Sequence, residues 1–450
     1  MTTAPPAPIH AVTSVEERYV ELTPRSKIAF DEHMRLIPAG APGGISQTLP
    51  FPHQPYIERG DGCYVWDADD RKLVDLVYGD WLYPLGHHHP AITAALHAQV
   101  DKGPTFCLPD PNLGTRFATL LLDRLPWMDK VRCTPSGTEA TMIAMRMARV
   151  ATGRPKIAKI IGGYHGLADP SLLVNGRYPN PYHVPAGLIP GTVESTVLLP
   201  YNDVAATVEV LQREGDDLAG VIVEPILGGS GMVPATPQYL RTLREVTRQL
   251  GMVLIFDEVV TFPYGPGGVQ GALGIEPDLT TLGKAIGGGT PLGVIAGRRA
   301  LMDLLDNRLN PSPGVRHAST VGGSPLCLAA GVAVLENLTP DVYRHLHDLG
   351  NALRLGVGTL AKKYHVPLQA TGAGHFFSFH WTQTPVTDFA SAITTDKATV
   401  GRLILSLYNE GFVMMSAQAG TLSTPMTRAH IDDLLSALER SLFACGLVQA

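Results

Sequence analysis

The 450-residue chain has few cysteines, no long apolar run and no concentrated basic segment. Its five cysteines lie far apart without a CxxC pair, which argues against a disulfide framework and favours reduced cysteines in a cytosolic protein. The net charge of −6 and the lack of a basic run of nucleic-acid type give no indication of a polyanion partner. No apolar run approaches the ~20 residues that cross a bilayer, and residues 1–10 lack the apolar core of a signal peptide. We therefore expect a cytoplasmic protein without nucleic-acid or membrane partners.

Apolar residues make up 45% of the chain, enough for a large core divided between two domains. A polar helix is expected over residues 14–36. From about residue 130, short apolar segments alternate with helical spacing, which predicts an α/β fold with a mostly parallel sheet between helices. We expect residues 1–75 to join a small domain, residues 76–334 to form the large domain, and residues 335–450 to complete the small α+β domain.

Two acidic residues follow the apolar segment at residues 252–256. Asp257 and Glu258 would stand at the carboxyl edge of the sheet, where open α/β sheets bind ligands. Two solvated acids at the end of a strand would look the same in sequence. This segment alone leaves both interpretations open.

A single lysine, Lys284, lies between an apolar segment at residues 279–282 and three glycines at 287–289. A desolvated lysine loses its proton more easily, which suits Schiff-base chemistry. The alternative is a surface lysine in a turn. A phosphate-binding P-loop does not fit, because Asp278 stands where its first glycine should be and Ala285 replaces its Ser or Thr.

Two further segments suggest parts of a ligand site. At Ser136, Gly137 and Thr138 a predicted strand turns into a helix, and hydroxyls, backbone N–H groups and the helix dipole can there hold an anion. A plain N-cap explains one hydroxyl equally well, but not the cluster. Tyr164 lies among glycines after the next strand and could stack flat on a ring, or simply pack in a loop.

Taken together, these segments supply a phosphate site, a ring stacker, an acid and a lysine. Their order and spacing resemble the class III aminotransferases, or ω-aminotransferases, of the fold-type I pyridoxal 5′-phosphate (PLP) enzymes. The resemblance extends from Ile37 to Thr424 and is specific, because seven stretches occur in the family's order. They are residues 86–90 (GHHHP), 136–140 (SGTEA), 163–166 (GYHG), 223–225 (VEP), 256–259 (FDEV), 282–285 (LGKA) and 317–325 (HASTVGGSP).

The resemblance implies a PLP-dependent transaminase with a seven-stranded, mostly parallel sheet in its large domain. It makes Lys284 the Schiff-base lysine and Asp257 the partner of the pyridinium nitrogen. Val259 and Tyr164 would pack on opposite faces of the ring, and Glu224 would lie beneath its substituents.

The resemblance also implies that residues of two subunits bind each cofactor phosphate. Ser136, Gly137 and Thr138 would form the phosphate cup of one subunit, and His165 also belongs to the implied cofactor-binding residues. Thr320 resembles the threonine that reaches the phosphate of the neighbouring subunit, so the family's sites are shared within a homodimer. Val321 departs from the pattern, since many relatives carry an aromatic residue there.

The substrate is less evident from the sequence. The overall pattern is similar to glutamate-1-semialdehyde aminomutases, but these carry an arginine in the glycine-rich loop, which here reads APGGISQ at residues 41–47. The arginines of β-amino-acid aminotransferases likewise lack a clear counterpart. Without a guanidinium, bidentate pairing with a substrate carboxylate is lost. We therefore predict a roomy, aromatic pocket for less polar amines, formed by Gly43, Gly44, Trp81, Tyr83 and Tyr164.

The favoured hypothesis is amino transfer from a primary amine, of aryl-alkyl or similar type, to a keto acid such as pyruvate. Arg177 could bind the acceptor carboxylate, or be a surface arginine. The alternatives are a glutamate-1-semialdehyde 2,1-aminomutase, a β-amino-acid aminotransferase, and a cofactor-binding protein without catalysis, against which the intact Lys284 and Asp257 argue. No metal is expected at His87, His88 and His89, because consecutive side chains point in different directions.

Overall fold

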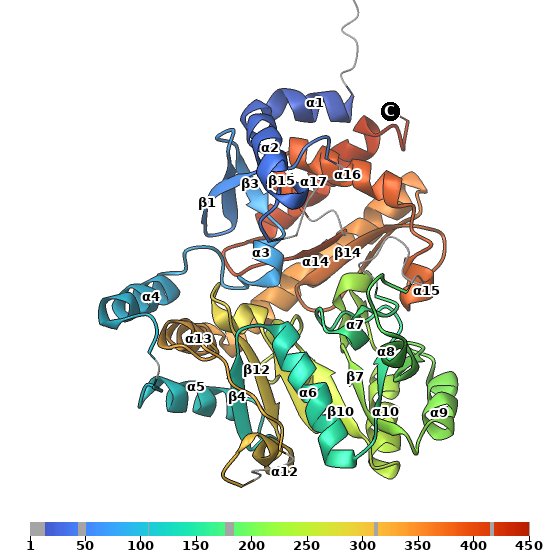
Figure 1. Ribbon diagram of the computed structural model, residues 1–450. Coiled ribbons are helices and arrows are strands. Elements are labelled where there is room, and N and C mark those ends of the chain that lie inside the picture. Colours follow the sequence, from blue (N-terminus) through green and yellow to red (C-terminus); the bar gives the residue numbers. More distant parts are fainter. Residues whose placement is uncertain are drawn as a thin grey trace, which may run out of the picture.

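The computed structural model describes residues 14–43, 51–106, 108–175, 184–309, 314–414 and 418–449. Gly44, Cys107 and Arg177, for which the sequence made predictions, lie outside the described residues. Figure 1 shows a large sheet flanked by helices in its lower half, and smaller sheets with long helices in its upper half. None of the described helices is long and apolar enough to span a membrane.

The large sheet has seven strands in the order β4-β12-β11-β10-β7-β5-β6. β12 runs antiparallel to both of its neighbours, and the other strands are mutually parallel. The predicted seven-stranded, mostly parallel sheet is therefore confirmed. Its strands are β4 (Lys130–Thr134), β5 (Lys156–Ile160), β6 (Thr196–Leu199), β7 (Leu218–Val223), β10 (Val253–Asp257), β11 (Leu279–Leu282) and β12 (Gly293–Gly297).

Helices cover this sheet because its central strands are apolar on both faces; every residue of β7 and β10 is buried. One core cluster joins the sheet to α6 (Gly137–Thr152), and a second joins it to α9 (Val204–Arg213) and α10 (Pro237–Gln249). A third packs α5 (Leu113–Leu122) and α13 (Pro325–Asn337) against β11 and β12.

The smaller sheets combine the two ends of the chain. Strand β15 (Phe412–Val413) pairs with β3 (Lys72–Asp75), which continues an antiparallel sheet formed by β1 (Ile57–Asp61) and β2 (Tyr64–Asp67). One apolar core unites residues 15–78 with residues 349–445. The predicted domain boundaries themselves remain predictions. Further elements there are β13 (Leu368–Thr371), β14 (Phe376–Trp381), β16 (Ala419–Thr421), α14 (Pro340–Tyr364), α16 (Lys397–Asn409) and α17 (Arg428–Ala444).

The single helix predicted over residues 14–36 is wrong. The structure has α1 (Val15–Leu22) and α2 (Pro24–Leu36), with Thr23 between them in a non-helical conformation. Pro24 lacks a backbone N–H and cannot continue a preceding helix, but it is well suited to the first position of a new one.

Candidate active site

The predicted cofactor residues follow the carboxyl ends of parallel strands of the large sheet. Ser136 comes after β4, Tyr164 after β5, Glu224 after β7 and Lys284 after β11, while Asp257 ends β10. Because these strands run in the same direction, their carboxyl ends meet at one edge of the sheet, which is where such sheets bind ligands.

Close packing between glycines and side chains joins these segments. A Cβ atom on Gly137 would lie 2.9 Å from both methyl carbons of Val259, and one on Gly283 would lie 3.2 Å from Val259 Cγ1. A Cβ on Gly166 would lie 2.3 Å from Thr138 Oγ1. Val259 is therefore in contact with both Gly137 and Gly283, and a larger residue at Gly137 or Gly166 would not fit without a shift of its neighbours.

The first turn of α6 has the donors that a phosphate needs. Ser136 is its N-cap, and the Ser136 hydroxyl accepts a hydrogen bond from the backbone N–H of Glu139 at 3.2 Å. Helix geometry leaves the N–H groups of Gly137 and Thr138 without a partner inside the helix, and the helix dipole favours an anion there. This donor set fits the phosphate of PLP.

Asp257 is 4% exposed and its carboxylate accepts three hydrogen bonds. Oδ1 accepts from the Thr281 hydroxyl at 3.0 Å and from the Val259 N–H at 3.2 Å, while Oδ2 lies 2.8 Å from His165 Nδ1. Burial lowers the pKa of His165, against the opposing effect of Asp257. A neutral His165 donates its Nδ1–H to Asp257 without cancelling the carboxylate charge, which fits a protonated ring nitrogen.

The loop that follows β5 is fixed by two buried charged side chains. Glu224 accepts hydrogen bonds from the backbone N–H of Tyr164 at 2.7 Å and of Gly228 at 3.2 Å. Lys159, which the sequence analysis did not single out, donates to the carbonyl oxygens of Gly163 at 2.9 Å and Ser171 at 3.2 Å. Two of these bonds hold the peptide group between Gly163 and Tyr164 from both of its polar atoms.

Lys284 begins a short 3₁₀ turn and has a positive φ of 49°. Its Nζ donates to the Asp80 carbonyl oxygen at 3.0 Å and to the Asp80 carboxylate, and lies 5.0 Å from the centre of the Trp81 ring. The structure thus brings Trp81 close to the lysine, while the predicted substrate pocket stays a prediction. Asp80 was missed, because an acid in a turn 204 residues away gives no local signal.

The other predicted pocket and loop residues lie as follows. Gly43 is exposed, and an added Cβ there would meet nothing within 4 Å. Tyr83 packs its hydroxyl against Gly289, where an added Cβ would lie 2.4 Å from the Tyr83 oxygen. Thr320 is exposed on a loop whose Gly322 lies against Thr134 at the end of β4.

The three consecutive histidines have different surroundings. His87 pairs with Asp75 at 2.6 Å, exposed His88 lies 3.5 Å from Asp61, and His89 is the N-cap of the helix at Pro90–Lys102. The described part of the chain contains no group of three or more side chains of metal-ligand type.

The two acids at the end of β10 have separate environments. Glu258 is fully buried and accepts from the N–H groups of Val269 and Gln270, the Gln270 amide and the Thr261 hydroxyl. These hydrogen bonds hold the segment at residues 261–270 in place, and none of them involves Asp257. Neither acid is solvated, so the solvated-acid interpretation is wrong for both.

Replacing Glu258 by glutamine is expected to lower stability and to flatten its pH dependence. Burial raises the pKa of Glu258 from 4.5 to about 7, so between these values the folded chain binds more protons and this group's contribution to stability falls as pH rises. The amide would also place its NH₂ against two donors, which costs about 1–3 kcal/mol. Calorimetric melting temperatures between about pH 5 and about pH 8 would measure both effects. Exposed Glu209→Gln is the control; equal slopes for Glu258→Gln and wild type would contradict the assignment.

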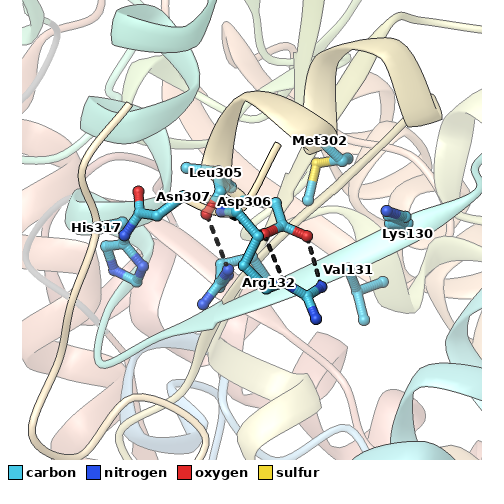
Figure 2. Close-up of a pocket in the computed structure, with 9 residues that line it drawn as sticks. Lys130, Val131, Arg132, Met302, Leu305, Asp306, Asn307 and His317 are labelled. Atoms are coloured by element: carbon cyan, nitrogen blue, oxygen red, sulfur yellow. Dashed lines mark hydrogen bonds and ion pairs between the residues drawn. The ribbon is translucent and has the colours of Figure 1, made fainter. Parts of the chain in front are cut away.

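The hollow in Figure 2 is separate from these residues. It has a volume of about 390 Å³ and is lined by the start of β4, where Lys130 and Arg132 lie, and by Asp306, Arg308 and His317. Arg308 pairs with Asp306 at 2.7 Å, so part of its charge is already balanced. The predicted cofactor residues follow the opposite, carboxyl ends of the strands, and none of them lines this hollow.

Comparisons with known proteins agree with the geometry. A family model described as "Aminotransferase class-III" matches residues 50–442. Glutamate-1-semialdehyde 2,1-aminomutase of Heliobacterium modesticaldum is 38% identical over 93% of this chain and 96% of its own length. Among solved structures, an omega-transaminase from Sphaerobacter thermophilus is similar with a TM-score of 0.88 and 34% identity, covering 94% of this chain and 98% of that one. A β-phenylalanine aminotransferase from Variovorax paradoxus has a TM-score of 0.87 and 33% identity, covering 96% and 97%.

Proposed function

Since the chain belongs to the class III aminotransferases, which are PLP enzymes, we propose that it transfers the amino group of a primary amine to a keto acid such as pyruvate. The observation that carries the catalytic part is the convergence of Lys284, Asp257 and the first turn of α6 at one edge of the sheet. Homodimerisation, with Thr320 reaching the partner's site, and a cytoplasmic location are part of the proposal.

The roles of the residues follow from their environments. PLP, when bound, supplies an aldehyde for amino groups and a ring that stabilises negative charge on the substrate carbon. The N–H groups of Gly137 and Thr138, with Ser136, would hold its phosphate, and Asp257 would keep the ring nitrogen protonated. Tyr164 and Val259 would fix the plane of the ring, with Glu224 beneath its substituents.

Lys284 would carry the cofactor and move the proton. As an amine it would take the proton from the amino-bearing carbon of the substrate and later return it as general acid. Its backbone stands in a conformation that is uncommon for a side chain of this kind. Such strain is found at functional sites, where the surrounding structure imposes it.

The preference for amines rests on the loop at residues 41–47, which has no arginine for a substrate carboxylate. Trp81, buried beside Lys284, supplies an apolar wall instead. Arg177 is the proposed partner of the acceptor's carboxylate, since a keto acid must bind in the same site.

A second candidate, glutamate-1-semialdehyde 2,1-aminomutase, is favoured by the names of the curated relatives at 35–38% identity. Against it stands the same missing arginine. The solved relatives include both a transaminase and an aminomutase, the latter from Pseudomonas aeruginosa PAO1 at 28% identity with a TM-score of 0.86. A β-amino-acid aminotransferase is the third possibility.

Adding one enantiomer of 1-phenylethylamine to the purified holoenzyme is expected to abolish the yellow absorption band of the cofactor, and pyruvate is expected to restore it. Each enantiomer is added separately, with glutamate-1-semialdehyde and β-phenylalanine as comparison substrates. Bleaching by an amine and recovery with pyruvate support the proposal. A band that responds to glutamate-1-semialdehyde alone would replace it with the aminomutase.

A further inference from the structure

The turn that carries Asp80 and Trp81 has an unusual backbone. Four consecutive residues of the turn Tyr78–Trp81 have positive φ angles of 48°, 63°, 70° and 68°, and Gly79 is the one glycine among them. A left-handed turn costs roughly 1–2 kcal/mol for each non-glycine residue. The chain therefore maintains this turn against its intrinsic preference.

The surrounding contacts explain how the turn persists. Asp75 accepts hydrogen bonds from the N–H groups of Val77 at 2.7 Å and Tyr78 at 3.1 Å, and its other oxygen pairs with His87 at 2.6 Å. The Tyr78 ring stacks on His87 with centroids 5.4 Å apart, and its hydroxyl bonds to Ser423. The turn is thus fixed from both sides.

The turn presents three groups to the ammonium of Lys284. Both the carbonyl oxygen and the carboxylate of Asp80 accept from Lys284 Nζ, and the Trp81 ring lies 5.0 Å from the same nitrogen. The side chains of Asp80 and Lys284 are each 16% exposed, so the pair is largely shielded from water. Carboxylate, carbonyl and aromatic face are the groups that bind alkylammonium ions.

We propose that Asp80 and Trp81 form an ammonium-binding site that Lys284 and the incoming amine occupy in turn. The proposal rests on the amino-transfer function, in which the substrate nitrogen replaces the lysine nitrogen on one cofactor carbon. While Lys284 is bound to the cofactor, the substrate ammonium takes its place at Asp80. After the exchange, Lys284 returns to the position seen here.

The exchange balances in bonds and protons. The carbon–nitrogen double bond to Lys284 breaks, and one to the substrate nitrogen forms on the same carbon. Two protons pass from the incoming ammonium nitrogen to the departing lysine nitrogen, because each double-bonded nitrogen carries one proton. The lysine leaves as an ammonium and releases one proton to water before it acts as the base. Asp80 stays a carboxylate throughout and pairs with the cation before and after, so it acts as a positioning residue.

The test variant is Asp80→Asn, because asparagine tolerates the left-handed conformation as well as aspartate does and removes the charge alone. Its matched control is Asp70→Asn: Asp70 also has a positive φ, of 62°, and pairs with Arg25 at 2.7 Å on the surface. Both variants remove one negative charge from a left-handed position.

The first measurement needs neither turnover nor bound cofactor. In the full-length Lys284→Ala apoprotein, calorimetry is expected to detect methylammonium binding in the place of the lysine ammonium. Adding Asp80→Asn should weaken this binding about 10- to 100-fold, the range for a charge-assisted hydrogen bond, while adding Asp70→Asn should leave it unchanged. Equal affinity in the Lys284→Ala and Lys284→Ala/Asp80→Asn proteins, or no binding to either, would overturn the proposal.

The second measurement uses the holoenzyme with the donor that bleaches its band. Asp80→Asn is expected to lower kcat/KM for that donor about 10- to 100-fold, mainly through KM, with PLP occupancy retained. An unchanged KM would overturn the ammonium site. Failure of every donor to bleach wild-type protein would instead overturn the proposed function, and the methylammonium result would still decide the role of Asp80.

Discussion

Replacing Lys284 by alanine is expected to reduce amino transfer at least ~10³-fold, because one side chain supplies both the nucleophilic nitrogen and the proton transfer. The phosphate donors at α6 and the contacts of Asp257 do not involve Lys284. The alanine variant should therefore still bind PLP, but without the covalent link. Stopped-flow absorbance with the preferred donor would measure the loss, and the mass of the protein after borohydride reduction would report whether the link is absent.

Lys284→Arg is the matched variant for this prediction. Arginine keeps a cation that can pair with Asp80, but it is not deprotonated in proteins and cannot replace lysine as base or nucleophile. Both variants should be inactive, whereas Lys363→Ala, at an exposed lysine that pairs with Glu439 at 2.6 Å, should retain activity. A Lys284→Ala protein that turns over at the wild-type rate would refute the assignment.

The fold could be predicted to the extent that local sequence determines it. The apolar segments at residues 252–256 and 279–282 match β10 and β11, because length and apolarity are local properties. The edge strand β6 (Thr196–Leu199) was not recognised, since its four residues give no distinct period and its place is set by pairing with β5.

The candidate site was predictable where the sequence places a reactive residue beside glycines. Gly137 is needed because a Cβ atom there would lie 2.9 Å from the Val259 methyl groups, and Gly283 leaves little room, at 3.2 Å from the same side chain. Glycines therefore stand next to Lys284 and Ser136 in the sequence, where they can be recognised from a single chain. The order of the segments then gave the family resemblance, and the resemblance assigned the roles that the residues alone left open.

Residues that act on the site from a distance were not predictable. Asp80 reaches Lys284 from a turn whose left-handed conformation depends on Asp75 and His87. Thr281 supports Asp257 across neighbouring strands, in a register that the sequence does not encode locally. The separate environments of Asp257 and Glu258 also arise from tertiary packing, because adjacent residues at the end of a strand point to opposite sides.

The environment of Asp257 indicates how its charge is maintained. His165 is fully buried, its pKa is lowered, and its Nε2 has no hydrogen-bond partner among the described residues. An imidazolium there would carry an unsolvated charge, so the neutral form with Nδ1–H toward Asp257 is favoured. Among the described residues Asp257 thus receives three hydrogen-bond donors and pairs with no lysine or arginine, so its carboxylate is available to the ring nitrogen.

Replacing Asp257 by asparagine is therefore expected to lower kcat about 10²- to 10³-fold, the range for losing one preorganised electrostatic group at a reacting centre. The amide keeps the size of the side chain but cannot hold the ring nitrogen protonated. Single-turnover kinetics of the donor half-reaction would measure the loss, together with a pH titration of the cofactor's absorption in each variant.

The adjacent Glu258→Gln variant is the control that separates charge from structure. It removes a carboxylate from the next residue, but one that contacts residues 261–270 and not Asp257. We expect it to change the melting temperature while leaving the rate per bound cofactor near wild type, and Asp257→Asn to do the reverse. If the two variants lost activity equally, the charge of Asp257 would have no special role, and packing at the end of β10 would account for both.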